Sequence, residues 1–174
     1  MLPPATVVLA GNLVTTSYVF FLNLAGSQMG IIPLLNQRLG PFDVSAKQRA
    51  KAFAVQLKKG GFWTISSSVV SALLGFTAAY LHPDPLTRRL LLFSGIASLG
   101  IFPITAATQI LKINSELCKY NREDSLSDVA EGSAQDKRVE ELVQKWEGKH
   151  KLRFASYFTA WALSLSAVVL NLKP

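Results

Sequence analysis

The stretch GFWTISSSVVSALLGFTAAYL (residues 61–81) contains no charged side chain over 21 residues. It ends at HPDP (82–85), where two prolines prevent a helix from continuing. A helix needs about 20 apolar residues to cross the hydrocarbon core of a bilayer, whereas a core helix of a soluble protein rarely needs so many. The stretch therefore predicts a membrane-spanning helix.

Three further segments of the sequence are, in the same way, almost free of charged side chains. Residues 1–37 lack any charged side chain, and charged residues make up only 17% of the whole chain, against about 25% in an ordinary soluble domain. Because a helix satisfies its own backbone in lipid, the expected fold is an all-α, integral membrane four-helix bundle. We expect residues 1–174 to form a single four-span domain, with a polar cytoplasmic loop at 115–151 and spans at about 5–35, 61–81, 90–111 and 154–172.

The segments between the spans are expected to be partly helical. Residues 45–59 have the composition of a short interfacial helix or of an extension of the second span. In the longer polar segment, residues 121–136 are typical of a solvent-exposed loop, and residues 137–154 are typical of a helix.

The distribution of Lys and Arg predicts the topology. Fifteen of the eighteen lie in the loops between spans one and two and between spans three and four, and the opposite side carries only Arg88, Arg89 and Lys173. Basic residues concentrate on the cytoplasmic side, so we expect both large loops there and both termini on the far side. Since these residues flank apolar runs, they indicate membrane topology and not nucleic-acid binding. The lack of a basic signal-like start suggests the endoplasmic reticulum as the membrane.

Several chemistries are disfavoured by what the sequence lacks. The single Cys118 excludes an internal disulfide, and the two histidines lie in separate loops, which argues against a haem or a di-metal bundle. No span contains Asp or Glu, so a proton-coupled transporter is not expected. The motifs GxGxxG, HExxH, CxxC and GxSxG are absent.

Polar residues recur at helical spacing within or beside three spans. Residues spaced by three, four or seven share one face of a helix. The stripes are Asn12, Thr16, Asn23, Ser27 and Gly30; then Thr105, Thr108, Gln109 and Lys112; then Trp146, His150, Arg153, Tyr157 and Ser164.

Two interpretations of the third stripe stay open. His150 and Arg153 are interfacial anchors if Arg153 reaches the headgroups and Trp146 belongs to an aromatic belt. Alternatively, the stripe lines a pocket for a flat aromatic or anionic ligand at the cytoplasmic mouth of the bundle. In both cases Glu147, Lys149 and Lys151 point away from the stripe and form a charged collar.

Several motifs together resemble the anthrone oxygenase family of small four-span membrane proteins. They are IIPLL (31–35), PITAATQILKINSEL (103–117) and the spacing W-x3-H-x2-R that opens the fourth span. Thr105 and Asn114 match the family's signature at the end of the third span, and Trp146, His150 and Arg153 match the signature at the start of the fourth. The polar insert before Trp146 has no place in this pattern.

The resemblance implies a cofactor-independent oxygenase that converts an anthrone to the anthraquinone with O2 as co-substrate and without a metal. His150 would act as the base, because imidazole titrates near neutral pH. Arg153 and Asn114 would stabilise the anion that forms. Trp146 and Tyr157 would wall the substrate, beside Thr105. The implied partners are a small hydrophobic aromatic substrate and membrane lipids, with no nucleic acid; protein partners are not specified.

The alternative function is a non-catalytic membrane scaffold or assembly protein whose long cytoplasmic loop binds a partner. A transporter for a small hydrophobic compound is a third interpretation, since polar stripes also line transport paths. The enzyme requires His150, whereas the scaffold requires the loop.

Overall fold

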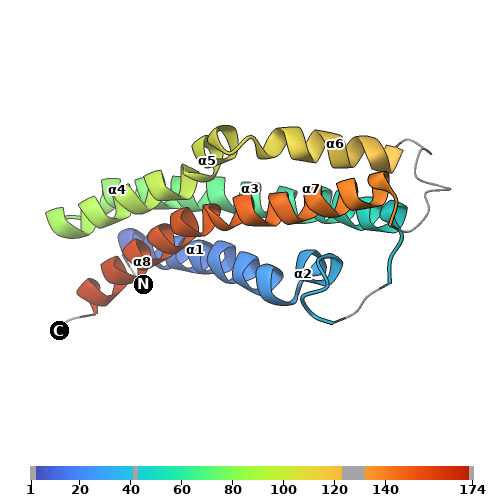
Figure 1. Cartoon of the computed structure of the whole chain (residues 1–174). Coiled ribbons are helices and arrows are strands. Elements are labelled where there is room, and N and C mark those ends of the chain that lie inside the picture. The colour runs from blue at the N-terminus through green and yellow to red at the C-terminus, as the bar shows by residue number, and fades with distance from the viewer. Residues whose placement is uncertain (1–2, 41–42, 123–131, 173–174) are drawn as a thin grey trace. The chain divides into compact units, whose positions relative to one another are not determined.

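The computed structural model describes residues 3–40, 43–122 and 132–172, and within these residues it contains helices and no strand. The helices are α1 Pro4–Met29, α2 Ile31–Leu35, α3 Ala46–Leu81, α4 Pro85–Leu99, α5 Ile101–Ala107, α6 Ile110–Arg122, α7 Ala134–Lys151 and α8 Arg153–Asn171 (Figure 1). The central part of the loop predicted at 121–136 lies outside the described residues.

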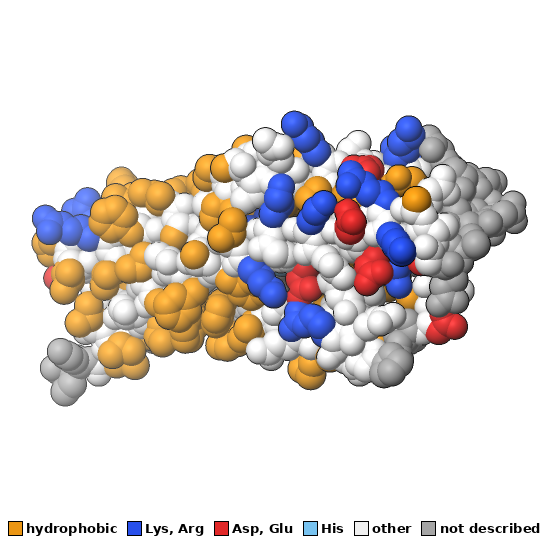
Figure 2. Space-filling model, viewed as in Figure 1, with side chains coloured by type: hydrophobic (Ala, Val, Ile, Leu, Met, Phe, Trp, Pro, Cys, Tyr) orange, Lys and Arg blue, Asp and Glu red, His pale blue; other side chains and the backbone are white. Residues whose placement is uncertain are grey.

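Four helical segments are long and apolar enough to cross a membrane, which confirms the predicted all-α membrane fold. They cover Pro4–Leu35, Ala46–Leu81, Pro85–Ala107 and Ala134–Asn171. Large apolar side chains such as Val14, Leu73 and Phe93 are more than half exposed, an arrangement that suits lipid and not water. Figure 2 shows hydrophobic side chains over the surface around α4 and α8, whereas charged side chains gather around α6 and α7.

The second predicted span begins earlier than its apolar run. Residues 46–59 continue directly into it, so they extend the span and do not form a separate interfacial helix. A reciprocal cap starts α3: the Ser45 hydroxyl accepts from the Gln48 N–H at 3.3 Å, and Gln48 Oε1 accepts from the Ser45 N–H at 3.0 Å. This capping box satisfies two backbone donors that would otherwise lack partners, and so defines where the helix begins.

The third predicted span is divided and ends early. Asp84 caps α4, accepting from the Thr87 N–H at 2.7 Å, and hydrogen bonds from Thr87 lower the pKa of the Asp84 carboxyl. After α5 the chain breaks at Gln109, whose φ of 55° lies in the left-handed region. The predicted stripe through Thr105, Thr108, Gln109 and Lys112 does not hold, because it assumed a constant helical rotation across this break.

The described residues form two compact units. We call residues 3–23, 64–104 and 153–172 the apolar unit, and residues 24–40, 43–63, 105–122 and 132–152 the polar unit. The apolar unit holds most of α1, the second half of α3, α4, the start of α5, and α8. The polar unit holds the end of α1, α2, the first half of α3, the end of α5, α6 and α7.

In the apolar unit, one buried amide joins three helices. Asn12 of α1 is fully buried; its Nδ2 donates to the carbonyl oxygen of Ser71 in α3 at 2.8 Å, and its Oδ1 accepts from Ser164 Oγ in α8 at 2.7 Å. Helices α4 and α8 are joined in the same way, since Ser94 Oγ donates to the carbonyl oxygen of Ala160 at 2.8 Å. Small polar residues thus connect the helices where hydrophobic association gives little driving force.

A close contact between α3 and α4 depends on two glycines. A Cβ added to Gly75 would lie 3.1 Å from the Gly95 Cα and from the Leu91 carbonyl oxygen. A Cβ added to Gly95 would lie 2.6 Å from the Phe76 ring. The small residues that the sequence places in the second span therefore allow the backbones to approach.

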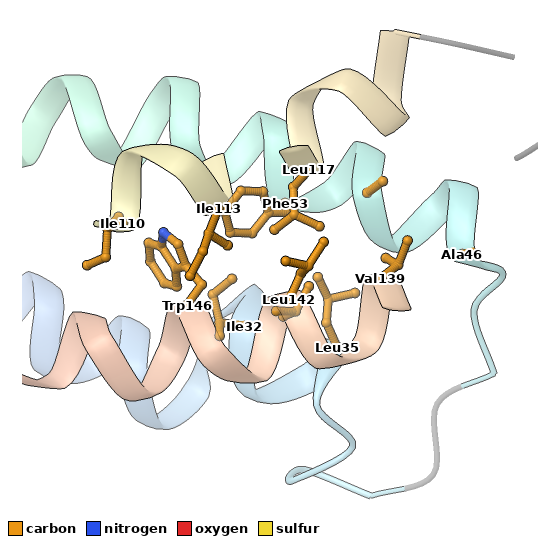
Figure 3. Close-up of a cluster of buried hydrophobic side chains, with 12 residues drawn as sticks. Ile32, Leu35, Ala46, Phe53, Ile110, Ile113, Leu117, Val139, Leu142 and Trp146 are labelled. Carbon is orange, nitrogen blue, oxygen red and sulfur yellow. The ribbon is translucent and has the colours of Figure 1, made fainter. Parts of the chain in front are cut away.

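The polar unit has its own apolar core, formed by α2, α3, α6 and α7 (Figure 3). Helix α7 presents Val139, Val143 and Trp146 to this core, at spacings of four and three residues. Helix α6 is amphipathic: its buried side chains Ile113 and Leu117 pack in the same core, and its remaining surface is mainly polar apart from the exposed Leu111.

Replacing Gly75 by Ala should destabilise the protein, whereas the same change at Gly61 of α3 should not. Both changes gain up to about 1 kcal/mol of helix propensity. Only the Gly75 Cβ meets backbone atoms, at a cost of roughly 1–3 kcal/mol from overpacking, since the nearest atom to a Gly61 Cβ is 4.0 Å away. Thermal unfolding in detergent measures the difference. Equal shifts in the two variants would contradict the close contact between α3 and α4.

Replacing Asn12 by Ala should lower the free energy of unfolding by about 1–3 kcal/mol, because two interhelical hydrogen bonds are lost. Thr15→Ala is the matched control, since the Thr15 hydroxyl bonds only to carbonyl oxygens of its own helix. Unfolding by SDS in mixed micelles measures both variants. A Thr15 variant that is as unstable as the Asn12 variant would show that the interhelical bonds do not matter.

Candidate functional site

The predicted site residues Trp146 and His150 lie together at the end of α7. Ser133 caps this helix, accepting from the Asp136 N–H at 3.3 Å, and the last turn carries Lys149, His150 and Lys151. The rings of Trp146 and His150 stack at a centroid distance of 4.6 Å and an angle of 10°. The predicted helical spacing of these two residues is thus realised as a direct ring contact.

The Trp146 side chain packs in the apolar core of the polar unit. Its indole is 8% exposed and meets the Phe53 ring edge-on at a centroid distance of 5.3 Å. Figure 3 shows the ring extending from α7 toward α6, beside Ile110 and Ile113. Because core packing fixes the indole, the His150 ring stacked on it has a defined platform.

Two polar atoms of predicted site residues in the polar unit are buried and lack a hydrogen-bond partner among the described residues. They are the Trp146 Nε1, a donor, and the Asn114 Oδ1, an acceptor on α6. An unsatisfied buried polar group costs about 1–3 kcal/mol, so most are paired in native proteins. Of the predicted site residues in the polar unit, Trp146 thus offers a donor and Asn114 an acceptor to a ligand or water.

Glu147 is the residue that the sequence prediction misplaced. It was expected in the charged collar, but it is 8% exposed, and its carboxylate accepts from Asn36 Nδ2 at 2.6 Å and pairs with Arg38. Lys151 approaches the same carboxylate at 3.8 Å. The collar prediction is wrong for Glu147, which is a buried anion held by residues of the turn after α2.

The local backbone explains how that turn reaches Glu147. Helix α2 ends in a Schellman motif: the Gln37 N–H donates to the Leu34 carbonyl oxygen, the Arg38 N–H donates to the Pro33 carbonyl oxygen, and Gln37 has a φ of 56°. The motif places the side chains of Asn36 and Arg38 at the carboxylate. One signal that sequence reasoning missed could have indicated the burial: Glu147 is four residues after Val143 and eight after Val139, both of which are core residues.

The other predicted site residues are distributed over both units. Thr105 lies in α5 within the polar unit, half-buried, and its carbonyl oxygen accepts from Thr108 Oγ1 at 3.4 Å. Arg153 and Tyr157 lie one turn apart at the start of α8 in the apolar unit, at 9% and 2% exposure. The structure thus brings Trp146 and His150 together in the polar unit. Arg153 and Tyr157 belong to the apolar unit.

A groove of about 440 Å³ lies elsewhere, in the apolar unit. Its lining residues come from α3 and α4, and no predicted site residue is among them. Among the described residues, no group of three His, Cys, Asp or Glu side chains is arranged to hold a metal ion.

Comparison with known families identifies one match. The sequence model described as anthrone oxygenase matches residues 53–163, which is more than half of the chain and includes every predicted site residue. Comparisons with curated proteins and with solved structures give no significant match.

Replacing Glu147 by Ala should destabilise the polar unit, because it leaves Arg38 and Asn36 without their shared partner. Breaking a buried ion pair costs about 3–5 kcal/mol, and we expect less here because the Arg38 side chain is 46% exposed. Glu141→Ala is the control, since its carboxylate is 56% exposed. Thermal unfolding and a double-mutant cycle with Arg38→Ala measure the coupling. No coupling between Glu147 and Arg38 would contradict the ion pair.

Proposed function

Because the chain belongs to the anthrone oxygenase family, we propose that it is a membrane-embedded oxygenase that oxidises an anthrone-type aromatic polyketide to the anthraquinone with O2. The observation that carries the proposal within this chain is the Trp146–His150 ring stack, which lies inside the matched region and includes the unsatisfied Trp146 Nε1. A flat, poorly soluble substrate also suits a protein with four membrane spans.

The proposed reaction needs few protein groups. A base removes a proton from the CH2 between two aromatic rings, and the delocalised carbanion transfers an electron to O2. Recombination forms a carbon–oxygen bond, and the resulting peroxide loses water to give the quinone. One anthrone and one O2 thus yield one quinone and one water, and the activated substrate itself reduces O2, without a metal or flavin.

His150 would be the base, since imidazole is the side chain best suited to proton removal at neutral pH. The unsatisfied Trp146 N–H would donate to the substrate's carbonyl oxygen, where negative charge develops after proton removal. Asn114 offers an amide oxygen for a phenolic hydroxyl and N–H donors for the anion. The indole face of Trp146 would also hold the imidazole in position by stacking on it.

Roles for Arg153, Tyr157 and Thr105 rest on the family resemblance. Arg153 would supply a cation for the enolate-type anion, and Tyr157 an aromatic wall. Thr105 would line the substrate site. The proposed topology places the loops around α6 and α7 in the cytoplasm, and the endoplasmic reticulum is the proposed membrane.

The test is turnover of emodin anthrone by membranes that contain the protein, followed by quinone absorbance. His150→Ala should lower the rate roughly 100-fold or more, since a general base typically contributes 10²–10⁴-fold. Trp146→Phe keeps the ring and removes the N–H, and should lower the rate about tenfold. Lys145→Ala on the exposed face of α7 is the control and should leave the rate unchanged.

Expression level and thermal unfolding of each variant separate loss of chemistry from loss of folding. If the intact protein gives no quinone above the spontaneous background, the oxygenase proposal fails. A His150 variant with full activity would refute the assignment of the base alone. Loss of function on changes to the polar loop, with none on His150→Ala, would instead favour the scaffold.

A further inference from the structure

Two arginines of the apolar unit stand apart from the chain's charge pattern. Arg88 and Arg89 lie in the first two turns of α4, and both are exposed. The charge bias places them on the side of the membrane where Lys and Arg are otherwise rare. No carboxylate pairs with either guanidinium among the described residues, and Asp84 is engaged in capping α4 through Thr87. Arg88 and Arg89 have no part in the helix contacts described above or in the proposed reaction.

The groove of about 440 Å³ in the apolar unit has both arginines in its lining. Its remaining wall is mainly apolar, with Phe76 and Ala79 from α3 and Leu92 from α4. The arginines come from next to the α3–α4 loop, whereas Phe76 and Leu92 lie about one turn deeper along their helices. The groove therefore combines a basic end with an apolar length.

The neighbouring residues indicate the depth of this groove in the membrane. Tyr80 also lines it and is 84% exposed, one residue before the end of the predicted span. Exposed tyrosines are enriched at the headgroup level, where one end of the ring meets lipid and the hydroxyl meets water. Leu92 is 44% exposed, so the apolar wall opens toward the surrounding lipid.

We propose that this groove binds an anionic phospholipid. The phosphate would contact Arg88 and Arg89, whose guanidinium forks match phosphate oxygens. One acyl chain would lie along Phe76, Ala79 and Leu92. Charge complementarity selects the anionic headgroup, and the continuity of the apolar wall with the membrane selects a lipid over a soluble anion.

The experiment titrates the detergent-solubilised protein with phosphatidic acid or phosphatidylcholine and measures the first bound lipid by native mass spectrometry. Arg88→Gln/Arg89→Gln should weaken phosphatidic acid binding about 30-fold, since each basic residue near a membrane surface contributes about fivefold. Binding of phosphatidylcholine should not change. Arg88→Lys/Arg89→Lys should bind phosphatidic acid with an affinity between those of the original protein and the Gln variant, because the charges are kept and the guanidinium forks are lost.

Lys58→Gln/Lys59→Gln is the matched control, an adjacent exposed basic pair in the polar unit. It should leave phosphatidic acid binding intact, and an equal loss in this variant would overturn the proposal. A phosphatidic acid with a photoreactive acyl chain should label α3 and α4 between Phe76 and Leu92; labelling confined to other helices would also overturn it.

Two further outcomes distinguish other occupants. Displacement of the lipid by excess inorganic phosphate would indicate a site for a soluble anion and would refute the lipid assignment. Loss of anthrone turnover in Arg88→Gln/Arg89→Gln would indicate that the groove takes the substrate, since a lipid site predicts unchanged turnover. The lipid measurement does not depend on catalysis, so its failure and the failure of the oxygenase proposal are separable.

Discussion

The hydrogen bonds of Asn12 show the constraint on which the apolar unit depends. In lipid, no water is available to satisfy a polar group, so every backbone and side-chain polar atom must find a partner inside the protein. The Asn12 amide satisfies both of its ends, with α3 through Ser71 and with α8 through Ser164. Close approach at Gly75 then brings α4 against α3, and serine hydroxyls join α4 to α8. Small and polar residues thus join the helices of the bundle, while many of its large apolar side chains, such as Val14, Leu73 and Phe93, are exposed toward lipid.

The polar unit follows the opposite rule, because its apolar side chains point inward and its charges outward. Glu147 and Arg49 are buried charges in this unit. The Glu147 carboxylate has partners there because Asn36 and Arg38 reach it from the Schellman motif that ends α2. On the adjacent positions of α7, Trp146 packs into the core and carries the His150 ring. Core packing therefore defines the platform on which the proposed chemistry would occur, while Trp146 Nε1 and Asn114 Oδ1 are left for a ligand. A site that is preorganised in this way loses little entropy when a flat substrate binds.

Charge and periodicity predicted the membrane spans well, because absence of charge over a window of this length has few other causes. The same approach failed where one side chain or one backbone angle decides the outcome. Glu147 was assigned to the charged collar because the helical register places it away from the Trp146 stripe, and its partners are more than 100 residues away in sequence. The stripe from Thr105 to Lys112 was drawn on a continuous helix, and the left-handed Gln109 interrupts that helix. Helical spacing alone identified the Trp146–His150 pair, but it said nothing of the Phe53 contact that fixes it.

The amino-acid sequence by itself determined the fold class, the four spans and the family, because these depend on local composition and on short motifs. Tertiary structure alone decided which polar residues are paired and which are left unsatisfied. Partners such as Asn12 with Ser164, or Arg38 with Glu147, are set by packing between distant segments. The groove that collects Arg88 and Arg89 with Phe76 likewise exists only once α3 and α4 pack together. Burial and pairing depend on what surrounds a residue in space, and sequence periodicity records only what surrounds it along the chain.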